Sequence, residues 1–451
     1  MAGISIFEFD TLTTSSPGSS NVVGQRQVSA EVFAWLETQA LRSSEAGQGS
    51  WLRLTHRHGR KAIQVNSFVG VIRCPNGFQI EVLPKLGKTN GEEEARHLLI
   101  EMLCCLGCFR HIQTSSAQLL ARRMPLLEVF IGEFLRAVDH TIKRGPRSDY
   151  LTEQGNLFAL RGKLQMAQHL RLNLCRRDRF YTEYDEYSLN RPENRLLHAA
   201  LRRALSWTAS QANQQLAREL CFMFNGIPAS DQINADFAQS RPDRSMAHYG
   251  AALAWARLIL QDESPLTGSG PHQAPSLLFP MEAVFEAFVA KHLKRQLCSE
   301  FSLRLQTRSL RLVRHKEQDW FQLKPDLLIQ SLKTNRLVLD TKWKLVDANK
   351  ANSKEKYGLD QNDFYQLQAY GQSYLDGDGD VVLIYPKTET FSQPLEVFDF
   401  PKSPGLRLWV LPFCLHTKQV LLPTCGSLAP FFSTSTVNAG EDTIILTTSL
   451  R

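Results

Sequence analysis

The sequence has no apolar stretch long enough to cross a membrane. A spanning helix needs about 20 apolar residues, and even the apolar run 98–109 is broken by Glu101. The first residues, MAGISIFEFDTL, lack the basic segment and apolar core of a secretory leader. We therefore expect a cytoplasmic protein without a membrane partner.

A nucleotide-binding phosphate loop is also missing. The tripeptide Gly87-Lys88-Thr89 has the ending of such a loop, which requires a further glycine five residues before Gly87. That position holds Val82. Any nucleotide-driven motor that works with this chain must therefore reside in another protein.

The cysteines do not form a recognisable metal or disulfide framework. They number nine, are scattered, and include no second Cys/His pair at zinc-binding spacing. Cys104, Cys105 and Cys108 lie in an apolar run that is typical of a helix. We expect buried, reduced thiols there.

The length and composition favour a globular protein of two or three domains. The chain has 451 residues with a net charge of 52 − 45 = +7, a mild excess that is compatible with a nucleic-acid partner. Short strands separated by turns predict a β-rich region over 1–95, and helical periodicity predicts a basic, helical region over 96–262. A segment rich in Pro, Gly and Ser, 263–280, is the expected linker to a last domain over 281–451.

The basic stretch 161–181 places arginines beside aromatic residues. Such a pattern is typical of a surface that contacts phosphates. A solvated face, or an interface with an acidic protein, explains the same residues equally simply. The sequence alone leaves these three interpretations open.

The most informative stretch is 322–345, QLKPDLLIQSLKTNRLVLDTKWKL. Two apolar β-type runs flank a polar turn over 331–336, which predicts a hairpin. Asp326 opens the first run, and Asp340 closes the second and is followed two residues later by Lys342. Because strand side chains alternate, Asp340 and Lys342 should share a face while Thr341 points away. The hairpin should bring Asp326 alongside them.

Two carboxylates and an ammonium in one place suit metal-assisted phosphodiester cleavage. Mg²⁺ is a hard cation that proteins hold with one or two carboxylates and waters, and Mn²⁺ is a common substitute. A lysine beside the metal can orient the attacking water and stabilise developing charge. Asp340-Thr341-Lys342 is the one place in the chain where an acid stands two residues before a lysine in this setting. The alternative is an edge strand that carries ordinary solvated charges.

Three further residues are candidates for the same site. Glu286 falls toward the apolar side of an amphipathic helix over 281–297, where it either completes the metal site or lies at the edge of that side. Gln366 and Tyr370 stand four residues apart on one helix face. They would contact the DNA backbone or hold Lys342; the alternative is a packing tyrosine with an exposed glutamine.

The last domain shows the order helix, strand, hairpin, helix, strand, with the first strand expected over 301–312. That order predicts a mixed sheet flanked by helices, and the whole chain is expected to be a multidomain α+β protein.

At this point the residues resemble a known family. The pattern Pro325-Asp326 … Asp340-x-Lys342 is similar to the PD-(D/E)xK nuclease motif, and the chain as a whole resembles McrC, the nuclease subunit of modification-dependent McrBC restriction systems. The blocks that carry the wider resemblance are Glu81–Leu86, Arg161–Leu164 with His169–Arg171, Asn190–Leu197, Phe285-Glu286 and Gln366-x-x-x-Tyr370.

The resemblance implies a Mg²⁺-dependent DNA endonuclease subunit, part of an antiphage system of the 5-methylcytosine type. It implies a hexameric AAA+ GTPase as partner, docked by the N-terminal region and stimulated by it, with double-stranded DNA as substrate. Asp326, Asp340 and Lys342 would be catalytic, with Glu286, Gln366 and Tyr370 as further catalytic residues and Asp326, Asp340 and Glu286 as metal ligands. The alternative is an adaptor that activates the GTPase while its nuclease site is idle.

Overall fold

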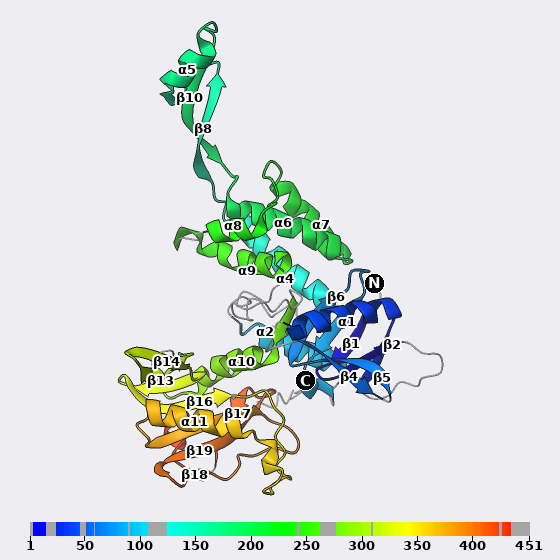
Figure 1. Ribbon diagram of the computed structural model, residues 1–451, viewed down its shortest axis with the longest axis vertical. Helices are drawn as coiled ribbons and strands as arrows, with labels where there is room; N and C mark the ends of the chain where they lie inside the picture. Colours follow the sequence, from blue (N-terminus) through cyan, green and yellow to red (C-terminus); the bar gives the residue numbers. More distant parts are fainter. Residues whose placement is uncertain are drawn as a thin grey trace, which may run out of the picture. The chain divides into compact units, whose positions relative to one another are not determined.

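The computed structural model is a mixed α+β protein (Figure 1). It describes residues 3–14, 24–45, 51–57, 59–88, 91–106, 124–240, 244–261, 277–307, 310–423 and 426–433. The chain divides into two compact units, Met1–Val284 and Phe285–Arg451. No helix among the described residues combines the length and the apolarity needed to cross a membrane.

Two four-stranded sheets form the first part of the first unit. One has the order β1-β7-β6-β11, with β1 at Gly3–Phe7, β7 at Gln79–Leu83, β6 at Phe68–Arg73 and β11 at Leu277–Pro280. The other has the order β3-β2-β5-β4, with β3 at Gln25–Val28, β2 at Thr11–Thr14, β5 at Arg60–Val65 and β4 at Leu52–Arg57. Strands therefore dominate this region, as the turn-rich sequence predicts.

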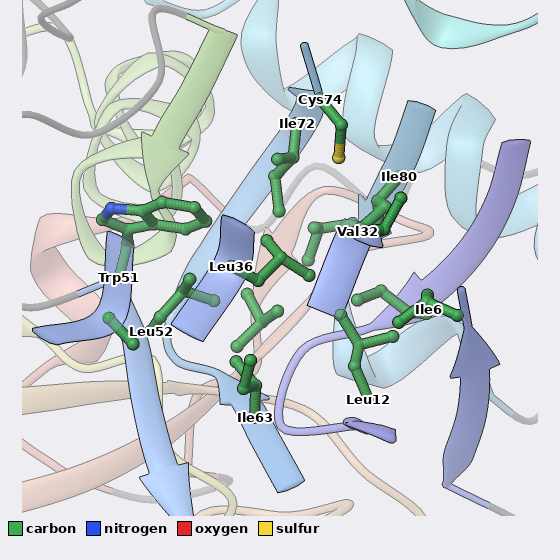
Figure 2. Close-up of a cluster of buried hydrophobic side chains, with 14 of the residues drawn as sticks. Ile6, Leu12, Val32, Leu36, Trp51, Leu52, Ile63, Ile72, Cys74 and Ile80 are labelled. Carbon is green, nitrogen blue, oxygen red and sulfur yellow. The ribbon is translucent and has the colours of Figure 1, made fainter. Parts of the chain in front are cut away.

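One hydrophobic core joins both sheets to helix α1, Ala30–Glu45. Figure 2 shows Val32 and Leu36 of α1 among side chains from the two sheets, including Ile6 and Ile63. Cys74 lies in the same core, and burial raises the pKa of its thiol to about 11. We therefore expect the Cys74 thiol to pack in the core and not to act as a reactive group.

Strand β11 corrects the expected linker, because its residues pair with β6 instead of remaining irregular. Gly70 lies opposite Leu278 in this pairing, with a φ of 130° that glycine tolerates. A Cβ at Gly70 would lie 2.0 Å from the carbonyl oxygen of Leu277. The glycine therefore permits this close pairing. The rest of the expected linker, 263–276, lies outside the described residues.

Helices with one apolar stripe form the next part of the unit. In α4, Leu126–Lys143, the stripe that includes Phe130, Phe134 and Val138 is buried. Pro192 stands in the first turn of α6, as its missing N–H allows. The bounds of the remaining helices are Glu92–Leu103 for α2, Pro192–Trp207 for α6, Gln211–Met223 for α7, Ile233–Gln239 for α8 and Gly250–Leu260 for α9. Cys104 is buried and Cys105 half-buried, whereas Cys108 lies outside the described residues.

The middle region, which was expected to be helical, also contains strands. Strands β8, Asp149–Leu157, and β10, Phe180–Ser188, form a long antiparallel pair, with β9, Lys163–Leu164, on the other edge of β10. Helix α5, Met166–Asn173, lies beside β10 (Figure 1). We call residues 149–188 the arm. The basic stretch 161–181 belongs to it.

The second unit contains a seven-stranded mixed sheet. The pairs β12/β15 and β15/β16 are antiparallel, whereas β16/β17 and β17/β19 are parallel. Strand β17 is buried on both faces, which explains its uninterrupted apolar run. The bounds are Ser302–Leu305 for β12, Leu327–Ser331 for β15, Thr334–Thr341 for β16, Gly379–Pro386 for β17, Phe398–Phe400 for β18, Ser403–Cys414 for β19 and Gln419–Val420 for β20.

Two helices cover opposite faces of this sheet (Figure 1). Helix α11, Gln361–Tyr374, packs Leu367 into a cluster with Leu408 and Val410 of β19. Helix α10, Met281–Gln296, packs Phe288 against Phe413, which alternation places on the other face of β19. The expected mixed sheet flanked by helices is therefore present in the second unit.

The strand predicted over 301–312 is two strands instead. The first is β12 of the large sheet, and the second, β13 at Leu310–His315, pairs with β14 at Gln318–Leu323. This two-stranded hairpin immediately precedes the Pro325-Asp326 dipeptide.

Candidate active site

The predicted hairpin is confirmed as β15 and β16. Leu327 pairs with Leu339 and Ile329 with Leu337, so both apolar runs lie side by side at the centre of the sheet. The turn is tighter than expected because it is made by two residues between the strands, at 332 and 333, both with positive φ. This pairing brings the start of β15 next to the end of β16, where the candidate residues lie.

Asp326 is fixed by the end of β16. Its Oδ2 accepts hydrogen bonds from the backbone N of Thr341 at 2.9 Å and from Thr341 Oγ1 at 2.8 Å. Thr341, which was expected to point away from the face shared by Asp340 and Lys342, therefore contacts the third candidate residue, Asp326. No hydrogen bond from the described residues reaches the second oxygen, Oδ1, which leaves it available to a ligand.

Asp340 and Lys342 form a buried ion pair. Lys342 Nζ lies 2.6 Å from Asp340 Oδ2, and only 1% of the Asp340 side chain is exposed. Burial, together with the charge of Asp326, raises the pKa of Asp340 to about 7. Burial lowers the pKa of Lys342, but the charge of Asp340 and its hydrogen bond outweigh that effect and leave it raised. Lys342 is therefore an ammonium at neutral pH.

A chain of hydrogen bonds from α11 holds the lysine. Lys342 Nζ donates to Gln366 Oε1 at 3.0 Å, and Gln366 Nε2 donates to Tyr370 Oη at 2.7 Å. Tyr370 Oη in turn donates to the carbonyl oxygen of Lys324 at 2.9 Å. Of the two roles considered for Gln366 and Tyr370, the geometry favours holding Lys342.

Sequence reasoning missed Asp363 and Lys344. Asp363 is buried in the first turn of α11, with Oδ1 3.8 Å from Lys342 Nζ and Oδ2 2.9 Å from Lys344 Nζ. The hydroxyl of Tyr385 donates to the same Oδ2 at 3.2 Å. Lys344 follows Lys342 at the two-residue spacing of a strand, and Asp363 precedes Gln366 at the three-residue spacing of a helix face. These two spacings could have identified Lys344 and Asp363 from the sequence.

Glu286 approaches from α10, on the other face. Its Oε1 accepts a hydrogen bond from Gln306 Nε2 at 3.0 Å, and the backbone N of Gln306 donates to the carbonyl oxygen of Asp326 at 2.9 Å. Burial and then the charge of Asp326 raise the pKa of Glu286 to about 7. Asp326 therefore interacts electrostatically with both Glu286 and Asp340.

The residues at this edge fit a divalent cation held by two carboxylates. Asp340 Oδ2 is buried, and apart from the Lys342 ammonium no donor among the described residues reaches it. Asp326 supplies a second carboxylate whose Oδ1 receives no hydrogen bond from the described part of the chain. Mg²⁺ is commonly held by one or two carboxylates, with waters and a phosphate completing its shell. In the described ranges, no three or more His, Cys, Asp or Glu side chains stand close enough to hold a metal by themselves.

The chain is similar to known proteins in sequence and in fold. The family described as McrBC 5-methylcytosine restriction system component matches residues 63–386, which is more than half of the chain and includes all six candidate site residues. The chain belongs to this family.

Solved structures with a similar fold come from Thermococcus gammatolerans. One is a refined half-complex from a tetradecameric assembly of McrB AAA+ hexamers with bound McrC, with 18% identity and a TM-score of 0.63, covering 93% of this chain and 97% of that chain. Another is a cryo-EM structure of the McrBC complex, with 19% identity and a TM-score of 0.49, covering 65% of this chain and 88% of that chain. No curated protein matches the chain.

Proposed function

We propose that this chain is the Mg²⁺-dependent endonuclease subunit of a GTP-driven, modification-dependent restriction complex that cleaves DNA. One observation carries the proposal: Asp326, Asp340 and Lys342 converge at one sheet edge, with the lysine held between a carboxylate and Gln366. We assign the cleavage to the compact unit Phe285–Arg451, as a nuclease of the PD-(D/E)xK type.

The residues divide the work as follows. Asp326 and Asp340 would hold Mg²⁺, which when bound makes a coordinated water more acidic and offsets charge on the scissile phosphate. Lys342, as an ammonium, orients the attacking water and stabilises the charge that develops on the phosphate. Gln366 and Tyr370 fix the lysine, and Glu286 adjusts the charge around Asp326.

A hexameric AAA+ GTPase of the McrB type is the proposed partner. The related McrC of T. gammatolerans is bound to McrB AAA+ hexamers, and this chain lacks a phosphate loop of its own at 82–89. The N-terminal region 1–95 is the proposed docking region, from which the partner's GTP hydrolysis is stimulated.

The exposed side chains of the arm favour the interpretation that it contacts another protein over the interpretation that it is only a solvated face. It carries a concentrated set of exposed large apolar side chains, and such surfaces mark sites of protein interaction. These are Tyr150, Phe158, Leu160, Met166, Leu170, Leu172, Leu174 and Tyr187.

Replacing the lysine tests the enzyme assignment. Lys342→Ala should abolish Mg²⁺-dependent DNA cleavage by the complex without affecting folding or partner binding. Lys350→Ala is the matched control, because Lys350 is an exposed lysine of the same unit that pairs with Glu355 at 3.6 Å. Cleavage by Lys342→Ala at the rate of the control would disprove the site.

The alternative function, an adaptor with an idle nuclease site, predicts a different result. With Asp340→Ala, the enzyme hypothesis predicts normal GTP turnover by the partner and no DNA cleavage. The adaptor hypothesis predicts that the unmodified chain stimulates GTP turnover while DNA stays intact in Mg²⁺ or Mn²⁺. Measuring both activities on the same preparations separates the two functions.

A further inference from the structure

The β13–β14 hairpin is exposed over most of its length. Every residue from 311 through 322 is exposed, although several are large and apolar. The exposed fractions are 50% for Leu312, 45% for Val313, 45% for Trp320 and 68% for Phe321. A two-stranded hairpin by itself is marginally stable in water, so this surface is suited to contact with a ligand.

The two faces of the hairpin differ in chemistry. Val313 pairs directly with Trp320, and Arg311 and His315 lie two residues on either side of Val313 on the same face. The ring centroids of His315 and Trp320 lie 5.0 Å apart, as this arrangement requires. We call Arg311, Val313, His315 and Trp320 the aromatic-basic face. By the same alternation it carries no carboxylate.

The opposite face has a different composition. It holds Leu312 and an ion pair in which Arg314 Nε lies 2.8 Å from Asp319 Oδ1. A basic side chain there is already neutralised by its partner. Positive charge that is free to meet a phosphate is therefore concentrated on the aromatic-basic face.

The root of the hairpin is built into the candidate active site. Leu323 is buried, and its carbonyl oxygen accepts a hydrogen bond of 3.1 Å from the hydroxyl of Tyr374 on α11. The next residue, Lys324, receives the hydrogen bond from Tyr370 that ends the chain holding Lys342. The hairpin thus ends three residues before Asp326 and is fixed by the same helix that positions the lysine.

We propose that the aromatic-basic face binds the DNA strand that is delivered to the carboxylates, with Trp320 stacking on a base and Arg311 and His315 contacting phosphates. Aromatic side chains interleaved with basic ones are typical of single-strand contact surfaces, because every base offers a face for stacking. A strand bound here lies next to the site, because the hairpin root and Asp326 are continuous in the chain. This inference rests on the proposed nuclease function.

Two exposed apolar residues of the hairpin provide a matched test. Trp320→Ala removes the ring from the aromatic-basic face, whereas Leu312→Ala removes a side chain of similar exposure from the opposite face. Because a base would stack on the Trp320 ring, Trp320→Ala should weaken DNA binding by about tenfold. Leu312→Ala should bind as the unmodified chain does. Binding is measured on the full-length chain with fluorescently labelled single-stranded and duplex oligonucleotides, with Ca²⁺ in place of Mg²⁺.

A charge variant supplies a second readout. Arg311→Gln should reduce the slope of log affinity against log salt by about 0.7–0.9, the value for one phosphate contact. Leu332→Ala, at an exposed turn of the neighbouring hairpin, should leave both affinity and slope unchanged.

Three outcomes would overturn the inference. One is unchanged DNA affinity in Trp320→Ala while the unmodified chain binds and cleaves DNA. Another is an equal loss in Trp320→Ala and Leu312→Ala, which would indicate a general effect on the hairpin. The third is lost assembly with the AAA+ partner and intact DNA affinity, which would make the occupant a protein. If the unmodified complex does not cleave DNA, that result contradicts the proposed function, and with it this inference.

Discussion

Lys342 Nζ donates a 3.0 Å hydrogen bond to Gln366 Oε1, across the space between the end of β16 and helix α11. This bond fixes an ammonium that also lies 2.6 Å from Asp340 Oδ2. Without it, the lysine would keep its charge but lose one of the two groups that set its direction. In the proposed mechanism the glutamine is therefore a positioning residue, and the lysine is the group that would act on the substrate.

Gln366→Leu tests that relationship, since leucine is of similar size and cannot accept the hydrogen bond. Loss of a partner that orients a catalytic group typically costs about 10–100-fold in activity, and we expect single-turnover DNA cleavage to fall in that range. Because the Lys342 charge remains, DNA affinity should change little. Gln368→Leu, on the same helix, is the control. A Gln366→Leu complex that cuts at the control rate would contradict the assignment.

Asp363 is the second residue whose replacement we expect to change DNA cleavage, through the pKa of Lys342. It is buried between two lysines, and its charge contributes to the raised pKa of Lys342. Asp363→Asn should therefore lower the pKa of Lys342 and shift the alkaline limb of the cleavage rate toward lower pH.

The same substitution should also destabilise the protein, by about 1–3 kcal/mol for a charge-assisted hydrogen bond to a buried carboxylate. Tyr385→Phe separates the two effects. It removes the 3.2 Å hydrogen bond to Asp363 but keeps the charge, so stability should fall and the pH profile should stay in place. The measurements are urea unfolding and pH–rate profiles. A pH profile that moves equally in both variants would contradict this explanation.

The sequence predicted the part of the fold where burial imposes a pattern. The runs Leu327–Ile329 and Leu337–Leu339 are buried at the centre of the sheet, so their composition and spacing predict a hairpin correctly. Helix α4 was predictable for the same reason, since one stripe of it faces a core. The contact of Thr341 with Asp326 was not predictable, because the alternation of side chains along a strand gives no information about a hydrogen bond formed at the end of the strand.

Most residues of the missed strands are exposed or half-buried, and among the side chains that the structure describes none of these strands has a buried apolar face. Strands β8 and β10 carry polar residues throughout, as in DYLTEQGNL and FYTEYDEYS, and so lack the alternation of a half-buried strand. The β13–β14 turn uses Lys316 and Glu317, both at positive φ, where a hairpin sequence usually shows Asn or Gly. No local turn signal marks it, so the sequence predicts only one strand over 301–312, which joins β12 to the start of β13.

The last prediction concerns proton uptake at the site. The folded state raises the pKa of Glu286 from 4.5 and of Asp340 from 3.8, each to about 7. Between about pH 4 and pH 7 the folded, metal-free protein therefore binds more protons than the unfolded chain, so its stability should fall as the pH rises through that window. For one such carboxyl, the free energy of unfolding changes by at most about 1.4 kcal/mol for each pH unit crossed.

Mg²⁺ requires the ionised carboxylate, so its binding should release protons and become about tenfold weaker per proton for each pH unit below 7. Isothermal titration of the metal in two buffers of different ionisation enthalpy measures the released protons, and thermal unfolding from pH 5 to 8 measures the stability. Glu286→Gln should remove part of the pH dependence of stability while the metal still binds through Asp326 and Asp340. Asp340→Asn should abolish metal binding. Metal affinity that is the same at pH 6 and pH 8 would contradict the placement of the ion beside Asp340, because the proton on that carboxyl and the metal compete for the same oxygens.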